Sequence, residues 1–184
     1  ASQITIDTSP DIVSTHNAAL VSRGLAVSMV TGDFPIPENS FEAPIALRNI
    51  TPYLDLATLL NCDMIRVGLK KTEDIQWAQR ASDQAQERGI RLAQQCHVAS
   101  LFERVNESLD LLRKIGRPNF GITYEPANLE ACGEDYGPET IKRLSDYIIN
   151  VYLQNQRLDS NGSDTLNTWS RGEVKVDHIP ISAT

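Results

Sequence analysis

Short apolar runs recur along this chain at intervals of about thirty residues, and a helix-like segment follows each of the first four. A strand followed by a helix at this spacing builds a parallel sheet. The predicted strands are Gly24–Val30, Cys62–Val67, Ile90–Gln95, Phe120–Tyr124 and Tyr147–Leu153. The chemistry of such a sheet lies just past the carboxyl ends of its strands. We therefore expect functional residues in Gly68–Lys71, Cys96–Ser100, Glu125–Asn128 and Gln154–Gln156.

The segments between these runs carry helix patterns. Apolar residues between Ala43 and Leu60 keep a spacing of three to four, with Pro52 as an interruption or restart. Thr72–Arg88 begins with a capping residue and stops before a glycine. Further helices are expected over Ser9–Gly24, Ser100–Ile115 and Gly137–Tyr147, and a polar tail follows the fifth strand.

Composition and charge narrow the classes of function. The chain has 184 residues, of which 41% are apolar and 22% charged, and this fits one globular domain with a sizeable core. A net charge of −7 with scattered basic residues disfavours nucleic-acid binding. No apolar stretch approaches the roughly 18 residues of a membrane span. The widely spaced Cys62, Cys96 and Cys132 predict reduced, packed thiols in a cytoplasmic protein.

Three of the predicted strand ends carry specific polar sequences. They read RLAQQCH over Arg91–His97, GITYEPAN over Gly121–Asn128 and NVYLQN over Asn150–Asn155. Together they resemble three successive strand ends of the sugar phosphate isomerase/epimerase family, the xylose isomerase-like TIM barrels. The resemblance covers residues 24–158 and implies an α/β fold of the (β/α)8 TIM-barrel type. It also implies isomerisation or epimerisation of a small sugar or sugar phosphate by proton transfer.

The resemblance further implies a divalent metal ion (Mn, Mg or Zn) held by Glu, Asp, His and a second Glu. Position by position, Gln95 stands where the first Glu is expected, Glu125 where the Asp is, and Tyr152 where the His is. The second Glu is expected on a strand beyond Thr184. A neutral amide and a phenol with a pKa of about 10 are weak ligands for a hard dication. Glu125 and Gln95 are therefore the remaining candidate metal ligands, and they make a poor cage.

Glu125 is the candidate catalytic residue, because isomerisation needs a base that removes a proton beside a carbonyl. Its alternative role is a helix-start charge before Pro126. His97 either faces the substrate or is a hydrogen-bonded structural histidine. Asn128 either contacts a sugar hydroxyl or satisfies loop backbone groups.

Five further residues could bind substrate. Arg66 could bind an anionic substrate or pair with a neighbouring carboxylate, either Asp63 or Glu125. Gln154 and Asn155 suit the recognition of sugar hydroxyls by neutral amides. The adjacent lysines of the second strand end, Lys70 and Lys71, could meet a phosphate, although such pairs are usually solvated.

Two functions remain open: a sugar isomerase/epimerase-like enzyme, and a non-catalytic sugar-binding relative that has lost the metal. A related DNA-repair endonuclease would need several histidines and a basic surface, which three histidines and the net charge of −7 disfavour. A closed barrel takes about 250 residues, and only five strands are predicted here. We therefore expect one domain over residues 1–184 that is part of a larger barrel, or an open sheet completed by dimerisation.

Overall fold

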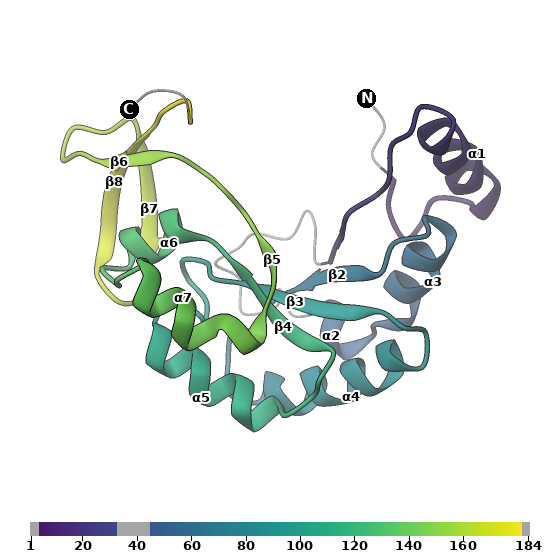
Figure 1. Ribbon diagram of the computed structural model, residues 1–184, viewed down its shortest axis with the longest axis horizontal. Helices are drawn as coiled ribbons and strands as arrows, with labels where there is room; N and C mark the ends of the chain where they lie inside the picture. Colours follow the sequence, from purple (N-terminus) through teal and green to yellow (C-terminus); the bar gives the residue numbers. More distant parts are fainter. Residues whose placement is uncertain (1–3, 33–44, 182–184) are drawn as a thin grey trace.

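The computed structural model describes residues 4–32 and 45–181, and its centre is a five-stranded parallel sheet (Figure 1). The strands are β1 (Val30–Thr31), β2 (Met64–Val67), β3 (Arg91–Gln95), β4 (Phe120–Tyr124) and β5 (Ile148–Val151). Each strand pairs in parallel with the next one along the chain. Consecutive parallel strands form the wall of a TIM barrel. The predicted incomplete barrel is therefore confirmed.

Helices connect the strands and line one side of the sheet (Figure 1). They are α1 (Pro10–Val21), α2 (Ile45–Arg48), α3 (Thr51–Leu59), α4 (Asp74–Gln86), α5 (Val105–Ile115), α6 (Pro126–Ala131) and α7 (Pro138–Leu144), with a 3-10 turn η1 (Ser145–Tyr147). No helix among the described residues is long and apolar enough to cross a membrane.

Several helix boundaries differ from the prediction. The helix expected over residues 43–60 is two helices, because Pro52 lies in the first turn of α3, where its missing N–H is tolerated. Residues 43 and 44 lie outside the described part of the chain. The α5 helix begins at Val105 rather than at Ser100. Helix α6 follows Glu125 at once, because Pro126 also fits a first helical turn.

Most strands are shorter than predicted, and β1 and β5 differ most from their predicted ranges. Among the described residues, strand β1 contains Val30 and Thr31 and pairs with β2. Strand β5 ends at Val151, and its pairing with β4 shifts register between Ile122 and Thr123.

The polar segment after β5 forms a second sheet, which was not predicted (Figure 1). Its strands are β6 (Gln156–Leu158), β7 (Asp164–Thr168) and β8 (Gly172–His178), arranged antiparallel in the order β6-β8-β7. The buried carboxylate of Glu103 anchors this sheet. It accepts hydrogen bonds from the backbone N–H groups of Ala99, Trp169 and Ser170. This clamp joins the β7–β8 turn to the loop after β3.

The two faces of the parallel sheet differ in polarity, since side chains alternate along a strand. Ile65, Leu92 and Ile122 are fully buried in the core that the helices share with the sheet. The opposite face, here called the inner face, carries polar side chains. Gln95, Thr123 and Asn150 neighbour one another in the strand registers, and Arg66 lies on the same face beside Thr31 and Ala93.

Candidate functional site

The candidate site is centred on Glu125, which follows β4 directly and is 2% exposed. Its Oε2 accepts a hydrogen bond from Nε2 of Gln95, at the end of β3, and another of 2.6 Å from Nδ2 of Asn128 in α6. Glu125 is the N-cap residue of α6, yet its side chain makes no capping hydrogen bond. The carboxylate is therefore directed to the neighbouring amides and does not act as a helix cap.

The surroundings of Glu125 change its affinity for a proton. Burial raises the pKa of its carboxyl above the ordinary range, and the Gln95 hydrogen bond is the largest opposing influence. Positive charge on His97, the Asn128 hydrogen bond and the charge of Arg66 also lower this pKa, by smaller amounts. Burial prevails. A carboxyl group with a raised pKa is better matched to proton transfer near neutral pH.

Gln95 holds an unused acceptor in this site. Its side chain is 5% exposed, and its Oε1 has no hydrogen-bond partner among the described residues. The orientation of the amide follows from its neighbour, because the donor Nε2 must face the Glu125 carboxylate. A buried acceptor without a partner costs about 1–3 kcal/mol. A hydroxyl of a ligand would satisfy it.

His97 stands beside this group on the loop after β3. Its Nδ1 lies 2.9 Å from the carbonyl oxygen of Val98. A carbonyl oxygen only accepts, so Nδ1 carries the hydrogen and the neutral ring has Nε2 as its acceptor. The structural role predicted for His97 is thus present, and the ring also acts electrostatically on Glu125.

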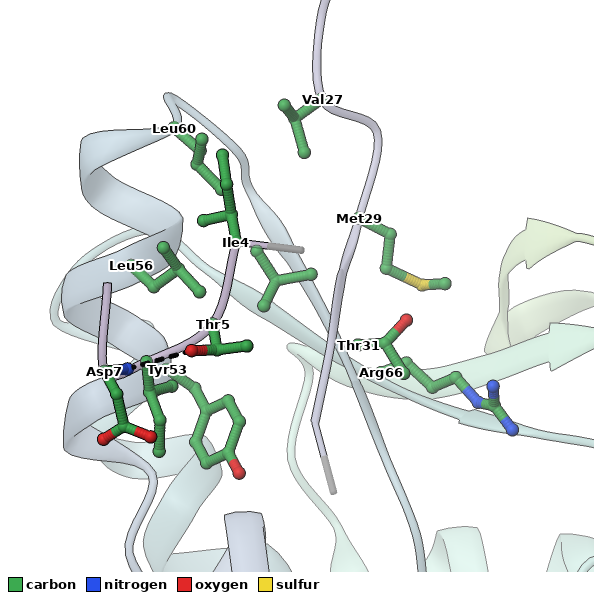
Figure 2. Close-up of a pocket in the computed structure, with 12 residues that line it drawn as sticks. Ile4, Thr5, Asp7, Val27, Met29, Thr31, Tyr53, Leu56, Leu60 and Arg66 are labelled. Atoms are coloured by element: carbon green, nitrogen blue, oxygen red, sulfur yellow. Dashed lines mark hydrogen bonds between the residues drawn. The ribbon is translucent and has the colours of Figure 1, made fainter. Parts of the chain in front are cut away.

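Arg66 lies on the inner face of β2 and borders a cavity of about 570 Å³ (Figure 2). Asp63, one predicted partner of Arg66, instead forms an ion pair of 2.9 Å with Arg91. Within residues 4–32 and 45–181, no side chain forms an ion pair or hydrogen bond with the Arg66 guanidinium, although its charge acts on Glu125. Figure 2 shows this guanidinium on the same flank of β1 as Met29.

Two predicted substrate-binding residues lie near the second sheet instead. Asn155 donates a hydrogen bond of 2.9 Å from Nδ2 to the carbonyl oxygen of Pro180. The side chain of Gln154 lies 3.2 Å from Nδ1 of His178. Both border a small cavity of about 250 Å³ beside α6. The structure therefore brings Gln95, Glu125 and Asn128 together, with His97 and Arg66 close enough to act on them, but it groups Gln154 and Asn155 elsewhere.

Some residues of the strand ends differ from expectation or were missed. Lys70 is not solvated: it is 7% exposed, and its Nζ donates a hydrogen bond of 2.6 Å to the carbonyl oxygen of Ala99. Asn150 was not singled out, although its Nδ2 donates to Thr123 Oγ1 at 3.3 Å on the inner face. A polar residue inside an otherwise apolar strand was its only signal in the sequence. The three cysteines are free and buried, as predicted.

The residues present do not fit a divalent metal ion. Among the described residues, no group of three or more His, Cys, Asp or Glu side chains could hold one. Glu125 is a lone carboxylate, and Gln95 turns its amide N–H, rather than its oxygen, toward it. The backbone N–H of Tyr152 donates a hydrogen bond of 2.9 Å to the carbonyl oxygen of Tyr124. A hard dication needs several anionic or carbonyl oxygens.

Comparison with known proteins identifies the fold. The sequence matches no family model and no curated relative. Solved structures match over most of the chain. A xylose isomerase domain protein from Planctomyces limnophilus superposes with a TM-score of 0.71 and 14% identity, covering 91% of this chain and 66% of that one. A xylose isomerase-like TIM barrel protein from Mycobacterium smegmatis, solved with magnesium, superposes with a TM-score of 0.71 and 14% identity. The match covers 97% of this chain and 65% of that one.

A D-psicose 3-epimerase solved in the presence of D-fructose is also similar, with a TM-score of 0.65 and 12% identity over 86% of this chain and 63% of the other. The chain thus spans less than two thirds of the length of these structures. The fold is that of the xylose isomerase-like TIM barrels, and the resemblance read from the strand ends is confirmed at this level.

Proposed function

We propose that the inner face binds a small polyhydroxylated carbonyl compound, a sugar or sugar derivative, and that Glu125 moves a proton beside its carbonyl. The observation that carries this proposal is the buried Glu125 carboxylate, held by the amides of Gln95 and Asn128 at adjacent strand ends. Parallel α/β sheets place their chemistry at these ends. The similarity to a 3-epimerase solved with D-fructose supports a sugar as the ligand.

The donors and acceptors of the site suit hydroxyl recognition. Gln95 Oε1 is an acceptor without a partner among the described residues, and a sugar hydroxyl can donate to it. The amide nitrogen of Asn128 carries two hydrogens, of which one is directed at Glu125. The second can donate to an oxygen of the ligand. Neutral amides of this kind orient a polyhydroxylated compound without a metal.

A single carboxylate favours isomerisation over epimerisation. In an aldose–ketose isomerisation, one base removes the proton from the carbon that carries the hydroxyl, which gives an enediolate, and the hydroxyl proton passes to the former carbonyl oxygen. The same group, after its proton exchanges with water, delivers a proton on the same face to the former carbonyl carbon. Epimerisation instead needs an acid on the opposite face, and the described hydrogen-bond partners of the Glu125 side chain are amides rather than a second acid. We therefore propose Glu125 as the sole proton carrier of a one-base isomerisation.

A second function is non-catalytic binding of the same class of ligand. The observation that favours it is Gln95, a neutral amide hydrogen-bonded to Glu125 at the position where a charged ligand or catalytic acid is expected. In this case Glu125 accepts a hydrogen bond from a sugar hydroxyl and transfers no proton.

Solvent isotope exchange distinguishes the two functions. The purified chain is incubated in D2O with a panel of ketoses and aldoses, and deuterium beside the carbonyl is followed by NMR. We expect incorporation with the native chain and its loss in Glu125→Gln. The matched control is Glu139→Gln, an exposed glutamate in the first turn of α7, which should retain exchange.

Binding measured by calorimetry completes the test. Saturable sugar binding without any exchange would reject catalysis and support the non-catalytic function. If no member of the panel binds or exchanges, both functions are wrong. Equal exchange by the native chain and Glu125→Gln would reject Glu125 as the proton carrier.

A further inference from the structure

We propose that the substrate carries an oxyanion, either a carboxylate or a phosphate, and that the guanidinium of Arg66 binds it. This inference rests on the proposed function of the inner face, because it assigns the substrate class of the same site. It makes Arg66 a specificity-determining residue.

Arg66 differs from every other arginine of the chain. The sequence has twelve arginines. Each of the other eleven has a described contact: an ion pair, a hydrogen bond or a ring contact. The Arg66 side chain has none among residues 4–32 and 45–181, although it is partly buried on the inner face of a central strand. Its five N–H donors form a rigid fork that matches a carboxylate or a phosphate.

The surroundings of Arg66 leave room for such a group. Thr31 lies directly opposite Arg66 in the register of β1 and β2. In Figure 2 both side chains are on the Met29 flank, so the Thr31 hydroxyl adds a second kind of hydrogen-bond donor. The adjoining cavity of about 570 Å³ falls within the range of small-molecule sites. Asp7, the other charged residue that lines it, is on the opposite flank beside Tyr53 (Figure 2).

The separation of Arg66 and Glu125 sets the size of the substrate. Arg66 is level with Ala93 on β3 and Gly121 on β4 in the strand registers, so Glu125 lies two strands across and four residues further along β4. Two strand spacings and four residues of rise put the two backbones about 16 Å apart. The side chains shorten this span, and a chain of several carbons crosses it. The carbonyl end then lies at Glu125 and the anion at Arg66. An anion bound to Arg66 offsets the positive charge of the guanidinium, which then stabilises the ionised form of Glu125 less. Glu125 is therefore a stronger base when the substrate is bound.

Calorimetry with three open-chain probes tests the inference: sorbitol, gluconate and sorbitol 6-phosphate, which are neutral, carboxylate-bearing and phosphate-bearing. Hydrogen bonds to charged groups predict that at least one anionic probe binds about 10- to 100-fold more tightly than sorbitol. Arg66→Gln should lose this preference, and Arg66→Lys should keep part of it. Arg113→Gln removes an exposed arginine from α5 and should behave like the native chain. The tighter of the two anions identifies the class.

Three results would overturn the inference: equal binding of sorbitol and both anions, no binding of either anion, or a preference that survives in Arg66→Gln. Circular dichroism checks the fold of the variants; if Arg66→Gln does not fold, Arg66→Lys and the native ranking decide. The results also separate failure of the proposed isomerase function from failure of the anion inference. Absent proton exchange with an intact, Arg66-dependent anion preference rejects only the isomerase, whereas exchange of neutral sugars without anion preference rejects only this inference.

Discussion

Replacing Gln95 by glutamate should bring two carboxyl groups into contact at the proposed proton-transfer site and so destabilise the folded protein. In the native chain, Gln95 donates a hydrogen bond to Oε2 of Glu125, and both side chains are buried. The variant puts a second carboxylate at that contact. Two like charges about 4 Å apart repel by about 1 kcal/mol in water and about 4 kcal/mol at an effective dielectric constant of about 20. Because the site is buried, the larger value is the relevant limit.

The stability of the Gln95→Glu variant should therefore depend on pH. At about pH 8 we expect its free energy of unfolding to be about 2–4 kcal/mol below that of the native chain. Toward about pH 5 the two carboxyl groups share a proton, which restores a hydrogen bond and shrinks the difference. Urea unfolding followed by circular dichroism measures both. Gln86→Glu, at the exposed end of α4, is the control and should show neither effect.

Divalent metal ions provide a second readout of the same variant. A pair of carboxylates is a better site for Mn²⁺ or Mg²⁺ than one carboxylate and an amide. Added metal should raise the stability of Gln95→Glu at about pH 8 and leave the native chain unchanged. A variant whose stability is independent of pH would refute the reasoning about the buried pair. Equal stabilisation of the native chain by metal would refute the conclusion that its residues do not fit a dication.

Three other predictions concern stability and reactivity. Because burial raises the pKa of Glu125, the folded state binds a proton on this carboxyl more tightly than the unfolded state does. The free energy of unfolding should therefore fall as pH rises from the ordinary glutamate pKa through the raised one. Urea midpoints measure this fall, which should be smaller in Glu125→Gln. Burial raises the pKa of Cys96 to about 12, so a thiol reagent at about pH 8 should modify this residue only after unfolding, and modification of the native protein would contradict its burial. Gly121→Ala would put a Cβ 2.4 Å from the carbonyl oxygen of Tyr147 and should cost about 1–3 kcal/mol in thermal unfolding, whereas Gly68→Ala, which meets nothing within 4 Å, should cost far less.

Much of the fold follows from local patterns. Apolar runs such as Ile90–Gln95 and Phe120–Tyr124 predicted β3 and β4 almost to the residue, because central parallel strands are buried on both faces. The second sheet was missed for the opposite reason. Strand β8 lies outside the main core, and its apolar residues, Val174 and Val176, alternate with charged ones in a segment that reads as polar overall. Its attachment through Glu103 depends on a contact between residues that lie far apart in the sequence.

The candidate site was predictable in position but not in detail. Glu125 and Gln95 could be located because parallel strands end at the same edge of the sheet. Gln95 is the last residue of one buried run, and Glu125 follows the next. The hydrogen bond between them required the register of β3 and β4, which the sequence does not specify. The fate of Arg66 could not be predicted either. Its candidate partner Asp63 forms an ion pair with Arg91, at the start of the neighbouring strand β3. Only the three-dimensional structure shows this.

The central claim is that Glu125 transfers a proton without help from a divalent metal ion. The most direct measurement is the rate of solvent deuterium incorporation into the best sugar of the panel, recorded in excess chelator and again with added Mn²⁺. The account predicts the same rate in both conditions and no incorporation by Glu125→Gln. Incorporation that appears only with the metal, or that Glu125→Gln retains, would contradict it.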